Sequence, residues 1–187
     1  LTPLNARDGI YGVFGNHDYL EGIEVISKTL QNNINWITNT STTITKNDDS
    51  LLLLGVDDYN RGNPDLKKTF SNYSDKHFFK ILLSHNPDIT ISKDKDLLNH
   101  SNLILAGHTH GGQIKLPKIK PVICRTRQKK HVQSLSHFNS TAVYVSNGVG
   151  YGGVPLRVFC PPEIVVINLK PELRKNTESF QEVTQNI

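Results

Sequence analysis

The apolar residues of this chain form short, nearly continuous runs, and several of these runs end abruptly in polar residues. They lie at residues 10–14, 50–56, 78–83, 103–105, 142–146 and 163–169. A short, continuous apolar run is typical of a strand that is buried on both faces. The pattern therefore predicts a sheet of buried strands, with further short strands at residues 34–37, 42–45 and 113–116.

Helical periodicity is limited to a few segments. Residues 21–32 carry a partial helical stripe, and residues 64–71 are expected to form a short helix. Asn86-Pro87-Asp88 predicts a turn or helix that continues toward residue 98. Strands with few long helices between them fit the α/β or α+β class.

Three segments are polar and predict irregular structure. Residues 15–18 are expected to form a loop at the end of the first strand. Residues 117–136 are basic and irregular, as in a surface loop or lid, and residues 171–187 lack an apolar face. We therefore expect one domain over residues 1–170, followed by a mobile tail.

The polar residues at the ends of the apolar runs are rich in histidine. Gly15-Asn16-His17-Asp18 follows the first run, Ser84-His85 follows the third, and Gly107-His108-Thr109-His110 follows the fourth. Neutral imidazole is a common metal ligand, and the carboxyl ends of strands in open α/β sheets build functional sites. The pattern favours a metal site, although each motif alone is also compatible with ordinary histidines in a loop or core.

These motifs, in this order, resemble those of the calcineurin-like metallophosphoesterases. The longer segments 107–114 and 157–164 are similar to a subgroup of YkuE- and YaeI-type phosphodiesterases and UDP-diacylglucosamine hydrolases, and the resemblance runs from about residue 9 to residue 169. It implies an α/β (α+β) fold in which two mixed sheets pack face to face and helices flank them. It also implies hydrolysis of a phosphodiester, pyrophosphate or phosphomonoester, with a lipid-linked or nucleotide-sugar substrate as one option.

The resemblance implies two divalent metal ions, of manganese, iron or zinc, close together in the complete site. Asn16, His85 and His108 would bind the second ion, and His110 would bind the first. Such a pair binds the phosphate of the substrate and lowers the pKa of a bound water. The alternative for Asn16 is an ordinary turn residue.

By the same resemblance, His17 and Asp18 are the catalytic residues outside the metal ligands. His17 would protonate the leaving oxygen or stabilise charge on the phosphate, and Asp18 would orient the imidazole of His17 through a hydrogen bond. An exposed polar pair after a loop is the alternative. Arg157 is a candidate for a phosphate contact or for an ion pair with Glu163, and Gln113 is a candidate for shaping the substrate face or for a structural role.

The chain departs from the family pattern before residue 15. It lacks the early Asp-x-His motif and the Gly-Asp motif, whose carboxylate bridges the two ions; Asp75-Lys76-His77 comes too late in the chain to replace the first. We therefore expect a fold that is incomplete at its N-terminus, weak binding of one metal at most, and little activity by this chain alone. A complementing N-terminal chain would restore the site; the alternative is an inactive or split-gene remnant.

Composition and charge limit the kinds of partner that we expect the chain to bind. The 187 residues carry a formal net charge of +4, which suits an anionic phosphate ester. The densest basic run, residues 125–130, is short and contains no aromatic residue, so we expect no nucleic-acid partner. Cys124 and Cys160 match no metal or redox spacing and are expected to be free thiols.

The apolar pattern also bears on location. No apolar run approaches the length of about 20 residues that a membrane helix needs, and no signal peptide is recognised. We expect a cytoplasmic protein or a peripheral one at the cytoplasmic membrane, and a membrane-lipid substrate stays open. Four histidines outside the motifs receive no role: His77, His100, His131 and His137.

Overall fold

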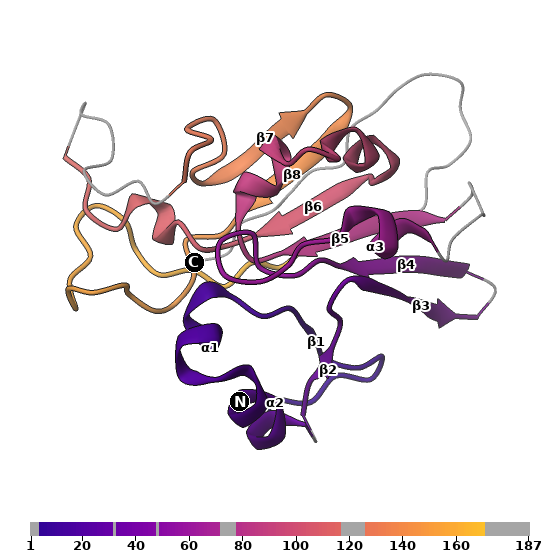
Figure 1. Cartoon of the computed structure of the whole chain (residues 1–187). Helices are drawn as coiled ribbons and strands as arrows, with labels where there is room; N and C mark the ends of the chain where they lie inside the picture. The colour runs from indigo at the N-terminus through magenta and orange to yellow at the C-terminus, as the bar shows by residue number, and fades with distance from the viewer. Residues whose placement is uncertain (1–3, 32, 48, 72–77, 117–125, 171–187) are drawn as a thin grey trace.

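A six-stranded mixed sheet forms the centre of the molecule (Figure 1). The computed structural model describes residues 4–31, 33–47, 49–71, 78–116 and 126–170. The strands lie in the order β3 (Thr40–Lys46), β4 (Asp49–Gly55), β5 (Phe79–Ser84), β6 (Leu103–Ala106), β8 (Thr141–Val145) and β7 (Ser134–Phe138). The four inner strands are parallel to one another, and β3 and β7 pair antiparallel with their neighbours. The carboxyl ends of β4, β5, β6 and β8 therefore meet at one edge.

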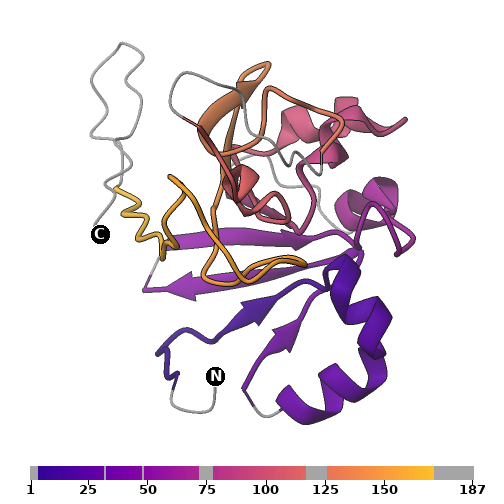
Figure 2. The same cartoon turned by 90° about the vertical axis from the view of Figure 1, so that its left-hand side faces the viewer.

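A second, smaller sheet lies against the first (Figures 1 and 2). Its two parallel strands are β1 (Tyr11–Gly12) and β2 (Asn35–Trp36), and the connection between them contains α1 (Asn16–Glu21) and α2 (Ile23–Leu30). Phe14 stacks on Trp36 with ring centroids 4.2 Å apart, which fixes the chain immediately before α1.

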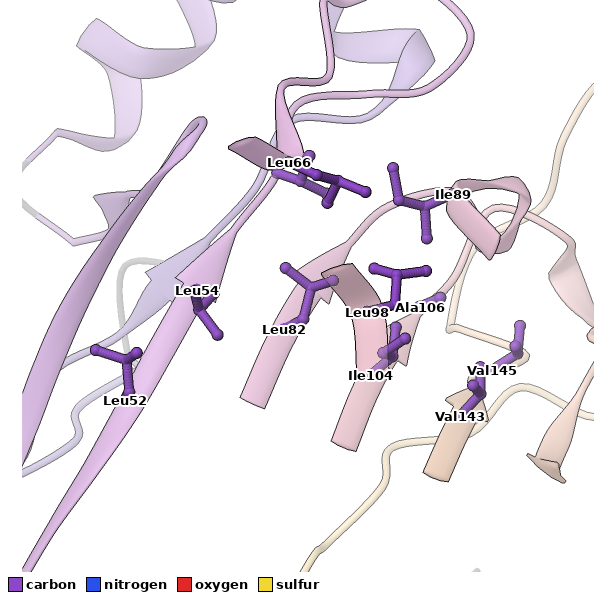
Figure 3. Packing of buried hydrophobic residues seen from close by; sticks show 11 residues of the cluster. Leu52, Leu54, Leu66, Leu82, Ile89, Leu98, Ile104, Ala106, Val143 and Val145 are labelled. Atoms are coloured by element: carbon purple, nitrogen blue, oxygen red, sulfur yellow. The ribbon is translucent and has the colours of Figure 1, made fainter. Parts of the chain in front are cut away.

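The inner strands bury apolar side chains on both faces, as their continuous apolar runs predict. One face carries Leu54, Leu82, Ile104 and Val143, which are fully buried (Figure 3). This face is covered by α3 (Leu66–Ser71) and by the 3₁₀ helices η1 (Pro87–Ile91) and η2 (Lys95–His100), which contribute Leu66, Ile89 and Leu98.

The opposite face of the sheet carries the alternate residues of the same strands. Leu53, Ile81, Leu103 and Tyr144 are buried there together with Ile37, which follows β2. Side chains from the small sheet and from the segment after residue 163 pack against them: Tyr11, Val13, Val165 and Ile167. The sheet thus lies between two layers, and the expected α/β class with two sheets is confirmed.

Four of the predicted inner strands and two predicted helices are confirmed as β4, β5, β6, β8, α2 and α3. Three predictions about irregular or helical segments are wrong. The predicted loop at residues 15–18 contains the start of α1. The segment that was predicted to continue toward residue 98 divides into the two 3₁₀ helices η1 and η2. Strand β7 lies partly within the segment 117–136, which was predicted to be irregular.

Two predicted strands do not form in the described residues. Residues 113–116 make only an isolated bridge between Ile114 and Val158. Residues 163–169 have the alternating burial of a strand but no ladder, so their backbone is not paired in a sheet. An apolar pattern alone fixes which side chains face the core, and a strand additionally needs a neighbour for its backbone hydrogen bonds.

Other expectations concern thiols, membrane helices and the tail. Cys160 is a buried free thiol, as expected, whereas Cys124 and residues 171–187 lie outside the described part of the chain. Among the described helices, none combines the length and the apolar character needed to cross a bilayer. The division into a domain at 1–170 and a tail stays a prediction.

Replacing Leu82 with alanine should lower the free energy of unfolding by about 3 kcal/mol, because it opens a cavity under the central strand β5. Leu82 is 0% exposed. Leu20→Ala is the matched control, since Leu20 in α1 is 55% exposed and should cost less than about 1 kcal/mol. Urea unfolding measures both values, and equal losses would contradict the assignment of the core.

Candidate metal centre

Two of the predicted ligands come from adjacent strand ends. β5 and β6 pair in parallel with Ser84 opposite Ala106, so His85 and Gly107 are the next residues on the two strands. The N–H of Gly107 donates to the carbonyl of His85 at 3.0 Å, which continues the ladder by one step. His108 therefore leaves β6 beside His85. Because both strands have apolar side chains buried on either side, this register is firmly set.

The third predicted ligand reaches the same point from the smaller sheet. Asn16 is the first residue of α1, after the N-cap residue Gly15. A Cβ atom on Gly15 would lie 2.7 Å from the Nδ1 and Cε1 atoms of His85, so only glycine lets the two segments approach this closely. Asp18 Oδ2 accepts a hydrogen bond from Gly15 N at 2.7 Å and stabilises the start of the helix.

Asn16, His85 and His108 form a tight triangle of donor atoms. Asn16 Oδ1 lies 3.0 Å from His85 Nε2 and 2.9 Å from His108 Nδ1, and the two imidazole nitrogens are 3.2 Å apart. Two ligand atoms at right angles around an ion, each about 2.1 Å from it, are about 3.0 Å apart. The three side chains therefore fit three neighbouring positions around one small divalent ion.

His17 and His110 lie at the same site but not in the triangle. Together with Asn16, His85 and His108, they line a small cavity of about 30 Å³. His17 is exposed. Within the described residues, no set of three or more His, Cys, Asp or Glu side chains is placed to hold a metal.

The position of Asp18 bears on its predicted role. Its carboxylate holds the backbone of Gly15, and no hydrogen bond between Asp18 and His17 is present in the described structure. The residue thus shapes the helix start that carries Asn16 and His17. Its orientation of the His17 imidazole stays a prediction.

The turn that carries His108 and His110 has an unusual backbone. His108, His110 and Gln113 have positive φ angles of 66°, 51° and 46°, a conformation that non-glycine residues adopt only when their surroundings hold it. Here the carbonyl of His110 accepts from Cys160 Sγ at 3.1 Å and from Arg157 Nη1 at 3.4 Å. These contacts fix the direction in which the two histidines leave the strand.

Arg157 and Gln113 have structural roles among the described residues. The guanidinium of Arg157 donates to the carbonyls of Asn147 and Gly150 at 2.8 Å each, whereas Glu163 instead accepts from Asn147. The buried side chain of Gln113 donates to Val154 O and accepts from Gly152 N, both at 2.8 Å. Both side chains therefore fasten the 147–160 segment against the histidine turn, and the predicted ion pair between Arg157 and Glu163 is absent there.

The electrostatics of the triangle favour metal binding over protonation. The pKa of His85 is lowered from 6.5 to about 3, mainly by burial and also by the neighbouring His108, His110 and His17. His85 is consequently neutral near pH 7 and presents a lone pair. A ligand that need not lose a proton binds a metal without proton competition.

Sequence reasoning missed a loop that borders the centre. Asn60 and Arg61 follow β4 and, with Asn16 and His108, line a depression of about 560 Å³. Asn60 Nδ2 lies 3.3 Å from His108 Nε2, so it contacts the ring nitrogen that points away from the triangle. No motif marks this loop; its only signal is a polar stretch directly after a strongly apolar strand.

The chain is similar to several metallophosphoesterases. It is 38% identical over 173 residues to a protein of Bacillus subtilis named uncharacterized metallophosphoesterase YkuE, covering 91% of this chain and 59% of that protein. It is 31% identical to the phosphodiesterase YaeI of Escherichia coli, covering 90% of this chain and 61% of that protein. It is 34% identical to the putative metallophosphoesterase F40B5.2 of Caenorhabditis elegans, covering 90% of this chain and 37% of that protein.

The chain thus spans about three fifths, or less, of the length of these relatives. No family model matches it. No solved structure matches it either.

Replacing Gly15 with alanine should weaken binding of Mn²⁺ at least about tenfold, because the new methyl group must displace the His85 ring or the start of α1. Isothermal titration calorimetry measures the affinity. Gly150→Ala is the control, since a Cβ atom there meets nothing within 4 Å. Equal Mn²⁺ affinity of wild type and Gly15→Ala would contradict the triangle as a metal site.

Acidification should destabilise the metal-free protein through His85. Between pH 6.5 and about pH 3 the unfolded chain binds a proton at His85 that the folded chain does not bind. The free energy of unfolding therefore falls as the pH falls, by about 2 kcal/mol at about pH 5. Urea unfolding at about pH 7 and pH 5 should show a smaller loss in His85→Asn than in wild type.

The pKa of His131 is also lowered by burial, but this residue is present in both proteins and cancels in the comparison. An equal loss in wild type and His85→Asn would show that His85 takes up a proton in the folded chain.

Proposed function

Because this chain belongs to the metallophosphoesterase family, we propose that it contributes the centre of a metal-dependent phosphoesterase, which hydrolyses a phosphodiester, pyrophosphate or phosphomonoester. The observation that supports this most strongly is the triangle of Asn16, His85 and His108, whose donor atoms lie 2.9–3.2 Å apart. Neutral donors at this spacing suit a small divalent ion. When bound, such an ion polarises a phosphoryl oxygen and makes a bound water more acidic.

The residues around the triangle supply the remaining chemistry of the proposal. His17 lies at the mouth of the same small cavity and is exposed, so its imidazole can reach a leaving-group oxygen of a phosphate ester and donate a proton to it. Asp18 fixes the helix start from which His17 projects. His110, on the third side, is the ligand proposed for a neighbouring ion.

The number of metal ions depends on ligands beyond the triangle. Among the described residues, Asn16, His85, His108 and His110 line the small cavity, and no group of three or more His, Cys, Asp or Glu side chains there could hold a metal. A carboxylate that bridges two ions would offset their mutual repulsion. We propose that a complementing N-terminal chain or segment supplies it, in keeping with the longer relatives, and that without it one ion binds weakly.

Substrate and partners follow from the same centre. The proposal is a phosphate-ester substrate, lipid-linked or nucleotide-sugar in type, without a nucleic-acid partner. The competing candidate is a remnant that binds a metal without catalysis. It is favoured because no group of three or more His, Cys, Asp or Glu side chains that could hold a metal is found among the described residues.

Hydrolysis of bis(4-nitrophenyl) phosphate in the presence of Mn²⁺ tests the proposal. Asn16→Ala and His108→Ala should each lower kcat/KM about 100-fold or more, because each removes one corner of the triangle. His100→Ala is the control, since His100 lies in η2 and lines neither cavity at the centre. Activity that does not need Mn²⁺, or that survives both substitutions, would contradict the proposal.

The same assay distinguishes a divided enzyme from a remnant that binds a metal without catalysis. Absence of activity in the chain alone, with recovery on adding an N-terminal chain that carries Asp-x-His and Gly-Asp, supports a divided enzyme. Absence of activity both in the chain alone and after adding the N-terminal chain favours the remnant.

A further inference from the structure

The depression beside the triangle is much larger than the metal cavity. Its volume is about 560 Å³, against about 30 Å³ for the cavity between the histidines. Pockets that enclose most of a small-molecule ligand have volumes of about 300–1,000 Å³. Asn16 and His108 belong to both spaces, so a group that enters the depression lies directly next to whatever the triangle holds.

The lining of the depression is polar and includes one guanidinium, that of Arg61. Its lining residues are Asn16, Asn60, Arg61 and His108. Arg61 is exposed, and within the described part of the chain its guanidinium makes no hydrogen bond or ion pair with another residue. A guanidinium offers a planar fork of donors that matches the oxygens of a phosphate.

The loop that presents Arg61 is held by two buried carboxylates. Asp57 Oδ2 accepts from Asn63 N at 2.8 Å, and Asp57 Oδ1 accepts from the hydroxyl of Tyr19 at 2.6 Å. Asp58 Oδ2 accepts from the backbone N–H groups of Asn60 and Arg61, at 2.9 and 2.8 Å. The backbone of the loop is therefore fixed before any ligand arrives, which lowers the entropy lost on binding.

Asn60 connects this loop to the metal centre. Its side-chain nitrogen lies 3.3 Å from Nε2 of His108, whose Nδ1 belongs to the triangle. Asn60 is thus a positioning residue for His108, and the next residue along the chain, Arg61, extends beyond it into the depression. The backbone of Arg61 is in this way held at a defined place relative to the triangle.

We propose that the depression binds a second anionic group of the substrate, in addition to the phosphate held at the triangle, and that Arg61 is the residue that binds it. This inference rests on the proposed function, because it takes the triangle as the site of the scissile phosphate. It narrows the substrate class to esters that carry a further phosphate or comparable oxyanion close to the scissile one. A substrate whose neighbouring group is an uncharged hydrocarbon does not match this lining.

Binding of inorganic pyrophosphate to the whole chain, measured by calorimetry with EDTA present, tests the inference without catalysis. Arg61→Gln should weaken binding about tenfold or more, as expected for the loss of charge-assisted hydrogen bonds, and Arg61→Lys should weaken it less. Arg7→Gln is the control, since Arg7 is also exposed but pairs with Asp8 and lines neither cavity. In NMR spectra, pyrophosphate should shift the side-chain amide signals of Asn60.

Absence of pyrophosphate binding by wild type, or equal binding by wild type and Arg61→Gln, would overturn the inference. A second measurement compares hydrolysis of the 4-nitrophenyl esters of thymidine 5′-monophosphate and thymidine 3′,5′-bisphosphate. Arg61→Gln should raise KM for the bisphosphate ester more than for the monophosphate ester, and equal changes would count against the inference.

The two measurements separate the two proposals. If pyrophosphate binding depends on Arg61 but neither ester is hydrolysed, the anion site is supported and catalysis by this chain is contradicted. If hydrolysis depends on Mn²⁺ but pyrophosphate binding does not change on substitution of Arg61, the proposed function is supported and the anion site is contradicted.

Discussion

The parallel pairing of β5 with β6 is the constraint on which the candidate metal centre depends. It places His85 and Gly107 on neighbouring strands, joined by a hydrogen bond of 3.0 Å, and so brings His108 against His85. Two strands with apolar side chains buried on both faces cannot shift by one residue without exchanging those faces. The geometry of the two histidines is therefore as rigid as the core beneath them. Asn16, from the smaller sheet, joins them only because Gly15 has no side chain.

The centre is surrounded by contacts that hold the backbone rather than the ligands themselves. Arg157 and Gln113 bind carbonyls and an amide of the 147–154 segment, and Asp57 and Asp58 bind amides of the 57–63 loop. Polar groups that are buried without partners are costly, and these interactions provide partners for the groups that they join while fixing the turns. The ligand atoms of the triangle lie 2.9–3.2 Å from one another. Neutral donors that lie so close together gain from a cation between them.

Sequence patterns predicted the parts of this structure that depend on side-chain type. The runs that became β4, β5, β6 and β8 are largely apolar on both faces. The ligand types that follow the runs at 10–14, 78–83 and 103–105 indicated the centre. The pattern failed where backbone pairing or loop geometry decides. β7 is polar and forms because β8 offers it a partner, whereas residues 163–169 have a strand-like pattern but no ladder. Arg61 carries no recognisable motif, because its relation to the centre arises from the carboxylates that fold its loop.

The stack of Phe14 on Trp36 links the smaller sheet to the segment that delivers Asn16. Trp36 is the single tryptophan of the chain. Its indole therefore acts as a built-in optical reporter for the docking of the smaller sheet, with no competing emission from other indoles. Any event that pulls Asn16 away from the two histidines by moving this sheet also changes the surroundings of that indole. The chain thus carries its own fluorescent label, stacked on the segment that leads into Asn16.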